Sequence, residues 1–147
     1  MRVERVLPIA IQRLITIRDD ALVTDAAKLL SSTHKSLVVV CNSDEVMVGV
    51  ISKTDVVRQM AHCQGVSCTM SVAAVMTRDV TYCHPNDVLQ DVLSIMKERG
   101  FVHIPIVDQD SRPSGVLNVR DALQVLLGEV VYDGSSLRDY IMGIGYH

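Results

Sequence analysis

Two segments of the chain carry the same order of residue types. Gly49-Val50-Ile51-Ser52-Lys53-Thr54-Asp55 and Gly115-Val116-Leu117-Asn118-Val119-Arg120-Asp121 each run from an apolar stretch through a polar residue to an aspartate. The offset between them recurs elsewhere, since 115 − 49, 121 − 55 and 91 − 25 (Asp91 and Asp25) all give 66. Self-similarity at a fixed offset is typical of repeated structural units. We therefore predict a tandem duplication, with any ligand bound between the two copies.

The length of the chain indicates that the two copies depend on each other. In a chain of 147 residues, each copy of about 60 residues would bury too little surface to be stable alone. We therefore expect one pseudo-symmetric module with a shared core. Apolar residues make up 48% of the chain, and we expect part of this surface to lie in a subunit interface.

Charge and hydropathy exclude several classes of partner. The formal net charge is −3 and no basic run is present, so the chain lacks the electrostatic footprint of a protein that binds duplex nucleic acid. No apolar run approaches the about 18 residues that a membrane-spanning helix needs. The start, Met1 to Arg5, is too charged for a signal peptide. We expect a cytoplasmic protein without a membrane partner.

The four cysteines give only a weak indication of chemistry. Cys41 and Cys83 lie in apolar stretches and are predicted to be core residues. His62, Cys63 and Cys68 fit no usual zinc spacing and lack a fourth ligand. A thiol enzyme or redox sensor that uses Cys63 and Cys68 is a third hypothesis, for which no base or oxyanion site is evident.

Hydrophobic periodicity predicts the same elements twice, in the order β-α-β-β-α. In the first copy these are a strand at 15–17, a helix at 22–30, a hairpin of strands at 37–41 and 46–51, and a helix at 56–61. In the second copy they are a strand at 80–82, a helix at 88–96, strands at 103–107 and 115–118, and a helix at 119–127. The predicted fold class is α/β (α+β).

These elements divide the chain into four predicted parts. We expect a first repeat at 5–63, a linker at 64–71, a second repeat at 72–128 and a tail at 129–147. Ser135 and Ser136 are suited to cap a short helix in the tail, where Leu137, Tyr140 and Ile141 share a face.

The duplicated pattern resembles a pair of cystathionine-β-synthase (CBS) domains, also called a Bateman module. The likeness covers about residues 5–128 and rests on Val75–Val80, His103–Val107 and the two Gly-to-Asp signatures. The whole chain is similar to the small stand-alone CBS-pair proteins of bacteria. The resemblance implies two sheets flanked by helices, two clefts across a pseudo-twofold axis, and a homodimeric disc. It also implies binding of adenosine compounds such as AMP, ADP, ATP, NAD-type dinucleotides or S-adenosylmethionine.

The resemblance also assigns candidate ligand-binding residues. It implies that the aspartate of each signature binds the ribose hydroxyls, with the polar residue three positions earlier beside the ribose and phosphate. These pairs are Asp55 with Ser52 and Asp121 with Asn118. Asn118 departs from the usual hydroxyl, so the second cleft is expected to be empty or altered in specificity. Lys35 and His103 are implied as phosphate contacts.

The chemistry of these residues agrees with a nucleotide. A carboxylate accepts hydrogen bonds from two neighbouring hydroxyls, and a helix that begins near Thr54 or Val119 directs backbone N–H groups at a phosphate. Lys53 and Arg120 either reach that phosphate or lie on the solvated surface. Val38 and Pro105 are expected to wall the adenine.

A structural alternative exists for both signatures. Ser52-x-x-Asp55 and Asn118-x-x-Asp121 also fit a helix capping box, which needs no ligand. The first functional hypothesis is a non-enzymatic, homodimeric sensor that binds an adenosine ligand, requires no cofactor and signals to an unidentified protein partner. The alternative is an interaction module with vestigial clefts that docks on an enzyme or transporter.

Overall fold

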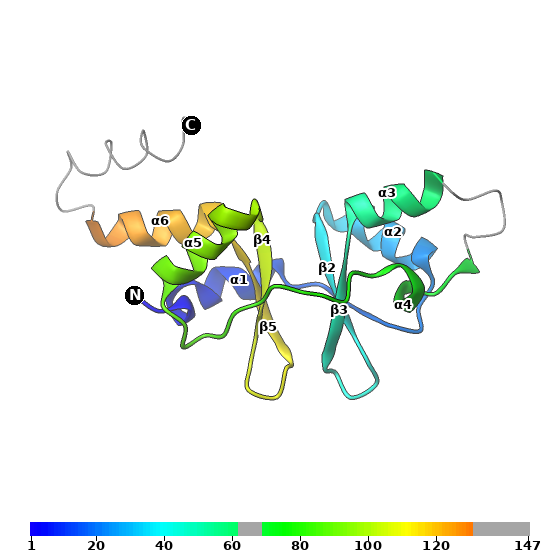
Figure 1. Ribbon diagram of the computed structural model, residues 1–147, viewed down its shortest axis with the longest axis horizontal. Coiled ribbons are helices and arrows are strands. Elements are labelled where there is room, and N and C mark those ends of the chain that lie inside the picture. The colour runs from blue at the N-terminus through cyan, green and yellow to red at the C-terminus, as the bar shows by residue number, and fades with distance from the viewer. Residues whose placement is uncertain (62–68, 131–147) are drawn as a thin grey trace.

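Two small β-sheets lie next to each other at the centre of the molecule, and the helices pack on their outer sides (Figure 1). The computed structural model describes residues 1–61 and 69–130. Residues 64–68 of the predicted linker, His62, Cys63, Cys68 and the predicted tail helix lie outside the described residues. The mixed α/β fold with two repeats confirms the predicted fold class.

The first sheet is three-stranded and follows the predicted order of elements. Its elements are β1 (Thr16–Arg18), α2 (Val23–Thr33), β2 (Leu37–Cys41), β3 (Met47–Ser52) and α3 (Lys53–Ala61). β1 pairs parallel to β2, and β2 pairs antiparallel to β3. Val38, Val39 and Val40 are fully buried. This burial explains why the strand is apolar on both faces, because helices cover one face and the second sheet covers the other.

The second sheet has one strand fewer than predicted. Its elements are α5 (Leu89–Arg99), β4 (His103–Val107), β5 (Pro113–Asn118) and α6 (Val119–Val130), and β4 pairs antiparallel to β5. The strand predicted at 80–82 is wrong, because only Cys83 pairs with β4, in an isolated parallel bridge to Ile106. The next N–H group, that of His84, donates to Asp87 instead (2.8 Å). Pro85 then has no N–H to donate, so the pairing ends after Cys83. Residues 80–82 precede this bridge and connect the two sheets, because Thr77 pairs with Val50 of the first sheet and Cys83 with Ile106 of the second.

The leading helices cross over to the opposite half. The 3-10 helix η1 (Val3–Val6) and helix α1 (Leu7–Arg13) precede the first sheet, and α4 (Val72–Val75) precedes the second. Val3, Val6 and Ala10 nevertheless pack in the core of the second half, which also contains Leu89, Met96 and Ile106. Conversely, Val72 and Met76 pack in the core of the first half with Ala26, Leu30 and Ile51. The sequence analysis did not predict this exchange.

The two signature glycines make room for the crossing segments. A Cβ atom at Gly49 would lie 2.7 Å from both Met76 Sδ and the carbonyl oxygen of Thr77. A Cβ atom at Gly115 would lie 2.9 Å from Ala10. Real Cβ atoms do not approach other atoms so closely, so each signature requires glycine for close packing.

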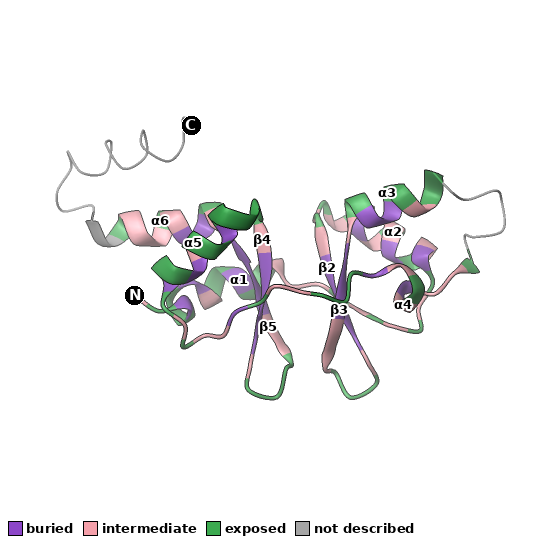
Figure 2. Ribbon diagram, viewed as in Figure 1, coloured by how far each residue is buried: buried purple, intermediate pink, exposed green. Residues whose placement is uncertain are grey.

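The halves also share a core between the sheets, as predicted. Val39, Cys41 and Val50 of the first sheet form one buried cluster with Val116 of the second. Figure 2 shows the buried residues concentrated on the strands and on the helix faces turned toward them. Cys41 and Cys83 are buried, as expected. Burial raises the pKa of Cys83 to about 12. No helix among residues 1–61 and 69–130 has both the length and the apolar character to span a bilayer.

Candidate functional site

Two neighbouring clefts lie along the seam between the halves. The larger, which we call the Asp55 cleft, has a volume of about 560 Å³. The smaller, the Arg13 cleft, has a volume of about 320 Å³. Four residues line both clefts: Ser36, Leu37, Val102 and His103.

Asp55 lies on the first turn of α3, immediately after β3 ends at Ser52. The Ser52 N–H donates to Asp55 Oδ2 (3.0 Å), and the Asp55 N–H donates to Ser52 Oγ (3.2 Å). This is the reciprocal geometry of a capping box. Both residues also line the Asp55 cleft, so the capping arrangement and a ligand site coexist at this position.

Two further side chains contact the Asp55 carboxylate. Thr77 Oγ1 lies 3.3 Å from Oδ2 and 3.5 Å from Oδ1, and the Arg58 guanidinium lies 3.7 Å from Oδ1. These distances are long for hydrogen bonds to a carboxylate. Thr77 was not predicted as a site residue, because it comes from the segment that crosses from the second copy.

The rest of the Asp55 cleft combines apolar walls with a second acid. Pro105, which was predicted to wall the adenine, lines it together with Val50, Val80, Ile104 and Phe101. Lys53 and Asp79 also line it. The expectation for Val38 is wrong, because its fully buried side chain packs in the core of the first half and lines neither cleft. Strand alternation explains this, since neighbouring side chains face opposite sides of the sheet.

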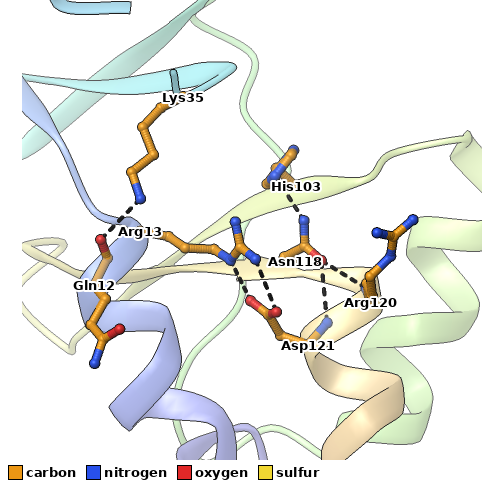
Figure 3. Close-up of polar contacts among 7 residues, drawn as sticks. All are labelled: Gln12, Arg13, Lys35, His103, Asn118, Arg120 and Asp121. Carbon is orange, nitrogen blue, oxygen red and sulfur yellow. Dashed lines mark hydrogen bonds and ion pairs between the residues drawn. The ribbon is translucent and has the colours of Figure 1, made fainter. Parts of the chain in front are cut away.

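The Arg13 cleft contains most of the predicted basic residues. Lys35, His103, Asn118 and Arg120 line it, and Arg13 joins them from the end of α1. Figure 3 shows that these side chains come from separate elements. The Lys35 ammonium group donates to the Gln12 carbonyl (3.1 Å).

Asn118 replaces the hydroxyl residue as the cap of α6. Its Oδ1 accepts hydrogen bonds from the N–H groups of Arg120 (2.8 Å) and Asp121 (3.2 Å). Its Nδ2 lies 2.9 Å from His103 Nε2. Burial is the main cause of a lowered His103 pKa; Arg13 and Lys35 lower it further, and Asp121 opposes them. A neutral imidazole is then able to accept the Asn118 hydrogen bond at Nε2.

Asp121 is paired with a guanidinium through both carboxylate oxygens, whereas Asp55 has only a long contact to one. It is buried, lines neither cleft, and forms a two-pronged pair with Arg13. Arg13 Nε contacts Asp121 Oδ2, and Arg13 Nη2 donates to Oδ1 (3.0 Å). The hydrogen bond to Asp121 raises the Arg13 pKa. The signature aspartates therefore occupy equivalent positions but have different partners.

The sequence analysis missed Arg13, although a signal for it exists. Position 13 and position 79 differ by the repeat offset of 66, so Arg13 is the counterpart of Asp79. The same offset relates residues that line the Asp55 cleft to residues that line the Arg13 cleft. An alignment of the two leading segments would have identified this exchange of charge.

The lining of the two clefts is suited to binding a small polar molecule. Across the parts of the chain that the structure describes, no group of three or more His, Cys, Asp or Glu side chains is placed to hold a metal ion. Each cleft instead combines charged groups with apolar walls, as small-molecule sites do.

Comparisons with known proteins agree on one family. The CBS domain family model matches residues 5–62 and 72–128. An uncharacterized 17.7 kDa protein of Acidianus ambivalens is 28% identical over 123 residues, which cover 84% of this chain and 73% of the relative. A protein of Methanocaldococcus jannaschii is 30% identical over 116 residues, covering 77% of this chain. The chain spans only 40% of that relative and 39% of a second one from the same organism.

Solved structures share the fold. The CBS-domain containing protein ATU1752 from Agrobacterium tumefaciens has a TM-score of 0.71 at 25% identity, covering 84% of this chain and 98% of that one. The CBS domain pair of protein MJ0100, in complex with 5-methylthioadenosine and S-adenosyl-L-methionine, has a TM-score of 0.71 at 22% identity, covering 88% and 98%. CBSX2 in complex with AMP has a TM-score of 0.71 at 22% identity, covering 84% and 96%.

Proposed function

Since the chain belongs to the CBS domain family, we propose that it is a non-enzymatic sensor that binds an adenosine-containing ligand in the Asp55 cleft. The observation that carries this proposal is the position of the Asp55 carboxylate, which lines a cleft of about 560 Å³ beside an apolar wall. Ligand binding alone is enough for signalling, because a ligand shifts a conformational equilibrium by its differential affinity for the two states.

The cleft offers a partner for each part of such a ligand. The Asp55 oxygens have only long contacts from Thr77 and Arg58 in addition to the Ser52 N–H. They therefore retain the capacity to accept hydrogen bonds from the two ribose hydroxyls. Val50, Val80 and Pro105 present apolar surface for the base. The N-terminus of α3 and Lys53 favour a polar or anionic substituent on the ribose.

The ligand class is supported by two structures of the same fold. The MJ0100 domain pair holds 5-methylthioadenosine and S-adenosyl-L-methionine, and CBSX2 holds AMP. All three ligands share an adenosine group and differ in the substituent on its ribose. We therefore propose that the cleft recognises the adenosine group. The binding experiment below compares three substituents on the ribose.

The proposal includes a homodimer that transmits the ligand signal to a protein partner. Val57 and Met60 on α3 are 66% and 52% exposed, and burial of such apolar side chains favours association. They belong to α3, which carries Asp55 on its first turn, so an interface there would sense the occupied cleft. Native mass spectrometry of the purified protein measures the number of subunits and any retained ligand.

The test compares two aspartates that have the same structural role but different surroundings. Asp55→Asn removes the charge that the ribose requires. Asp25→Asn is the matched control, because the Asp25 carboxylate accepts the Leu22 N–H (3.4 Å) at the start of α2 and lines neither cleft. Isothermal titration calorimetry would measure binding of AMP, 5′-methylthioadenosine and S-adenosylmethionine to each protein.

We expect Asp55→Asn to lower the affinity for the best of these ligands by about tenfold or more, since charge-assisted hydrogen bonds contribute about 1.5–3 kcal/mol each. Asp25→Asn should bind like the wild type. Equal affinities for all three proteins would refute the role of Asp55. Failure of the wild type to bind any of the three would favour the interaction module with vestigial clefts instead.

A further inference from the structure

The Arg13 cleft differs from the Asp55 cleft in charge, although the two are related by the repeat. We propose that the Arg13 cleft binds a phosphoryl group, and that Asp121 does not bind ribose there. This inference rests on the proposed function in treating the seam between the halves as a ligand site. It goes beyond that function in assigning different ligand chemistry to the two clefts.

The first argument is that Asp121 is already occupied. Its two carboxylate oxygens pair with Nε and Nη2 of Arg13, and its side chain is 8% exposed. A ribose diol would have to displace both of these charge-assisted hydrogen bonds. It would also leave the Arg13 guanidinium without its carboxylate partner, which is unfavourable in a partly buried site. A diol at Asp55 meets weaker competition, because the counterpart of Arg13 in that cleft is Asp79 and the Arg58 guanidinium approaches Asp55 Oδ1 only to 3.7 Å.

The second argument is the set of charges in the Arg13 cleft. Arg13 comes from the end of α1, Lys35 from the turn before β2 and Arg120 from the first turn of α6, and all three line this cleft. None of the described residues that line it is acidic, whereas Asp55 and Asp79 both line the other cleft. Asp121 pairs with Arg13 without lining the cleft, so Lys35 and Arg120 supply its excess positive charge, which favours an anion.

The third argument is that these cations keep hydrogen-bond donors for a ligand. Lys35 uses one of its three N–H donors on the Gln12 carbonyl. Arg13 uses Nε and Nη2 on Asp121, and its Nη1 points away from Asp121 (Figure 3). Asp121 therefore fixes the orientation of Arg13, which lowers the entropy loss when the guanidinium binds an anion.

The size of the cleft fits this ligand. Its volume of about 320 Å³ lies at the small end of the range of about 300–1,000 Å³ for ligand pockets. A pyrophosphate, or the phosphate tail of a nucleotide, needs less room than a whole nucleotide. Ser36, Leu37, Val102 and His103 line both clefts, so the phosphoryl group has two possible sources. It is either a separate anion or the tail of a nucleotide whose ribose lies at Asp55.

The test uses inorganic pyrophosphate as the probe. The double variant Lys35→Gln with Arg120→Gln removes two cations from the cleft and leaves the Arg13–Asp121 pair intact. The matched control, Lys28→Gln with Lys97→Gln, removes the same charge from exposed positions on α2 and α5 that line neither cleft. Isothermal titration calorimetry at low salt would measure pyrophosphate binding to the three proteins.

We expect the Lys35/Arg120 variant to lose about tenfold or more in pyrophosphate affinity, and the control to change by about twofold or less. Absence of pyrophosphate binding to the wild type would overturn the proposal. An equal loss in both double variants would also overturn it, because the anion would then respond only to net charge.

Adenosine, which carries no phosphate, separates this proposal from the function on which it rests. The Lys35/Arg120 variant should bind adenosine like the wild type, and Asp55→Asn should retain pyrophosphate binding. If adenosine fails to bind the wild type while pyrophosphate depends on Lys35 and Arg120, the proposed function fails and the anion site stands. If adenosine binds the wild type but pyrophosphate binding does not depend on Lys35 and Arg120, the anion site is refuted and the proposed function stands. A competition experiment between ADP and pyrophosphate identifies the source of the phosphoryl group. ADP should displace pyrophosphate if the cleft binds the tail of a nucleotide, and should not displace it if the cleft binds a separate anion.

Discussion

The two signature aspartates differ because of residues that lie far from them in the sequence. Asp55 and Asp121 occupy the same turn of equivalent helices, and each is followed by an apolar residue and belongs to a capping motif. The segment that crosses from the other half brings a different group to each carboxylate. It supplies the hydroxyl of Thr77 to Asp55 and the guanidinium of Arg13 to Asp121. A single side chain on a crossing segment therefore changes the chemistry of a duplicated site.

His103 makes the stability of the protein depend on pH. Its pKa is lowered in the folded state by burial and by Arg13 and Lys35, against the opposing effect of Asp121. The unfolded chain, with a histidine pKa of about 6.5, binds more protons than the folded chain in the range below that value. The contribution of His103 to the free energy of unfolding is therefore complete above pH 6.5 and decreases as the pH falls toward the folded pKa.

The variant His103→Gln tests this dependence, because glutamine keeps an acceptor for Asn118 but does not titrate. We expect the difference in free energy of unfolding between wild type and His103→Gln to shift in favour of the variant between pH 7 and pH 5. Urea unfolding at several pH values measures it. A difference that stays constant over this range would contradict the assignment.

At the scale of elements, the signature glycines fix the distance between each hairpin and the segment that crosses it. We expect Gly49→Ala to destabilise the protein by about 1–3 kcal/mol, the usual effect of overpacking, because its Cβ would contact Met76 and Thr77 at 2.7 Å. Denaturant unfolding measures this change.

Gly128 in α6 provides the control for this substitution. No atom lies within 4 Å of the position that its Cβ would take. Gly128→Ala should therefore raise the free energy of unfolding by up to about 1 kcal/mol, since alanine favours the helix. A Gly49→Ala protein as stable as the wild type would show that the hairpin and the crossing segment separate easily.

Local sequence patterns predicted the helices and strands whose hydrophobic periodicity is clear within the element itself. The hairpin of β2 and β3, the helices α2 and α5 and the β4–β5 hairpin lie where the pattern placed them. The strand predicted at 80–82 failed, because these residues connect the bridge of Thr77 to the first sheet with the bridge of Cys83 to the second. The crossing of α1 and α4 is a tertiary effect with no local signal. For that reason Thr77 and Arg13 were missing from the predicted site, while Asp55 and Pro105 were placed at a cleft.

At the scale of the whole molecule, each half depends on a segment that precedes the other. Val6 precedes the first sheet but is fully buried in the core of the second half. Val72 precedes the second sheet but is fully buried in the core of the first half. Neither half has a complete core without the other's leading segment, in agreement with the shared core expected for repeats of this size.

Two matched substitutions test this exchange. Val6→Ala and Val72→Ala each remove two methyl groups from a buried position and should each cost about 2 kcal/mol. Hydrogen exchange should show the local effect in the distant half. Val6→Ala should speed exchange in α5, β4 and β5, and Val72→Ala should speed it in α2, β2 and β3. Faster exchange confined to the sheet that follows each substituted residue in the chain would contradict the crossed packing.

The wall that the two clefts share has a thermodynamic consequence. Ser36, Leu37, Val102 and His103 face both hollows, so a molecule that moves any of them on one side alters the affinity on the other. Such linkage is reciprocal, because the factor by which the first occupant changes binding of the second equals the factor in the reverse direction. If both proposed sites bind their ligands, the module would respond to the combination of two concentrations, and a measurement with either compound alone would underestimate its range.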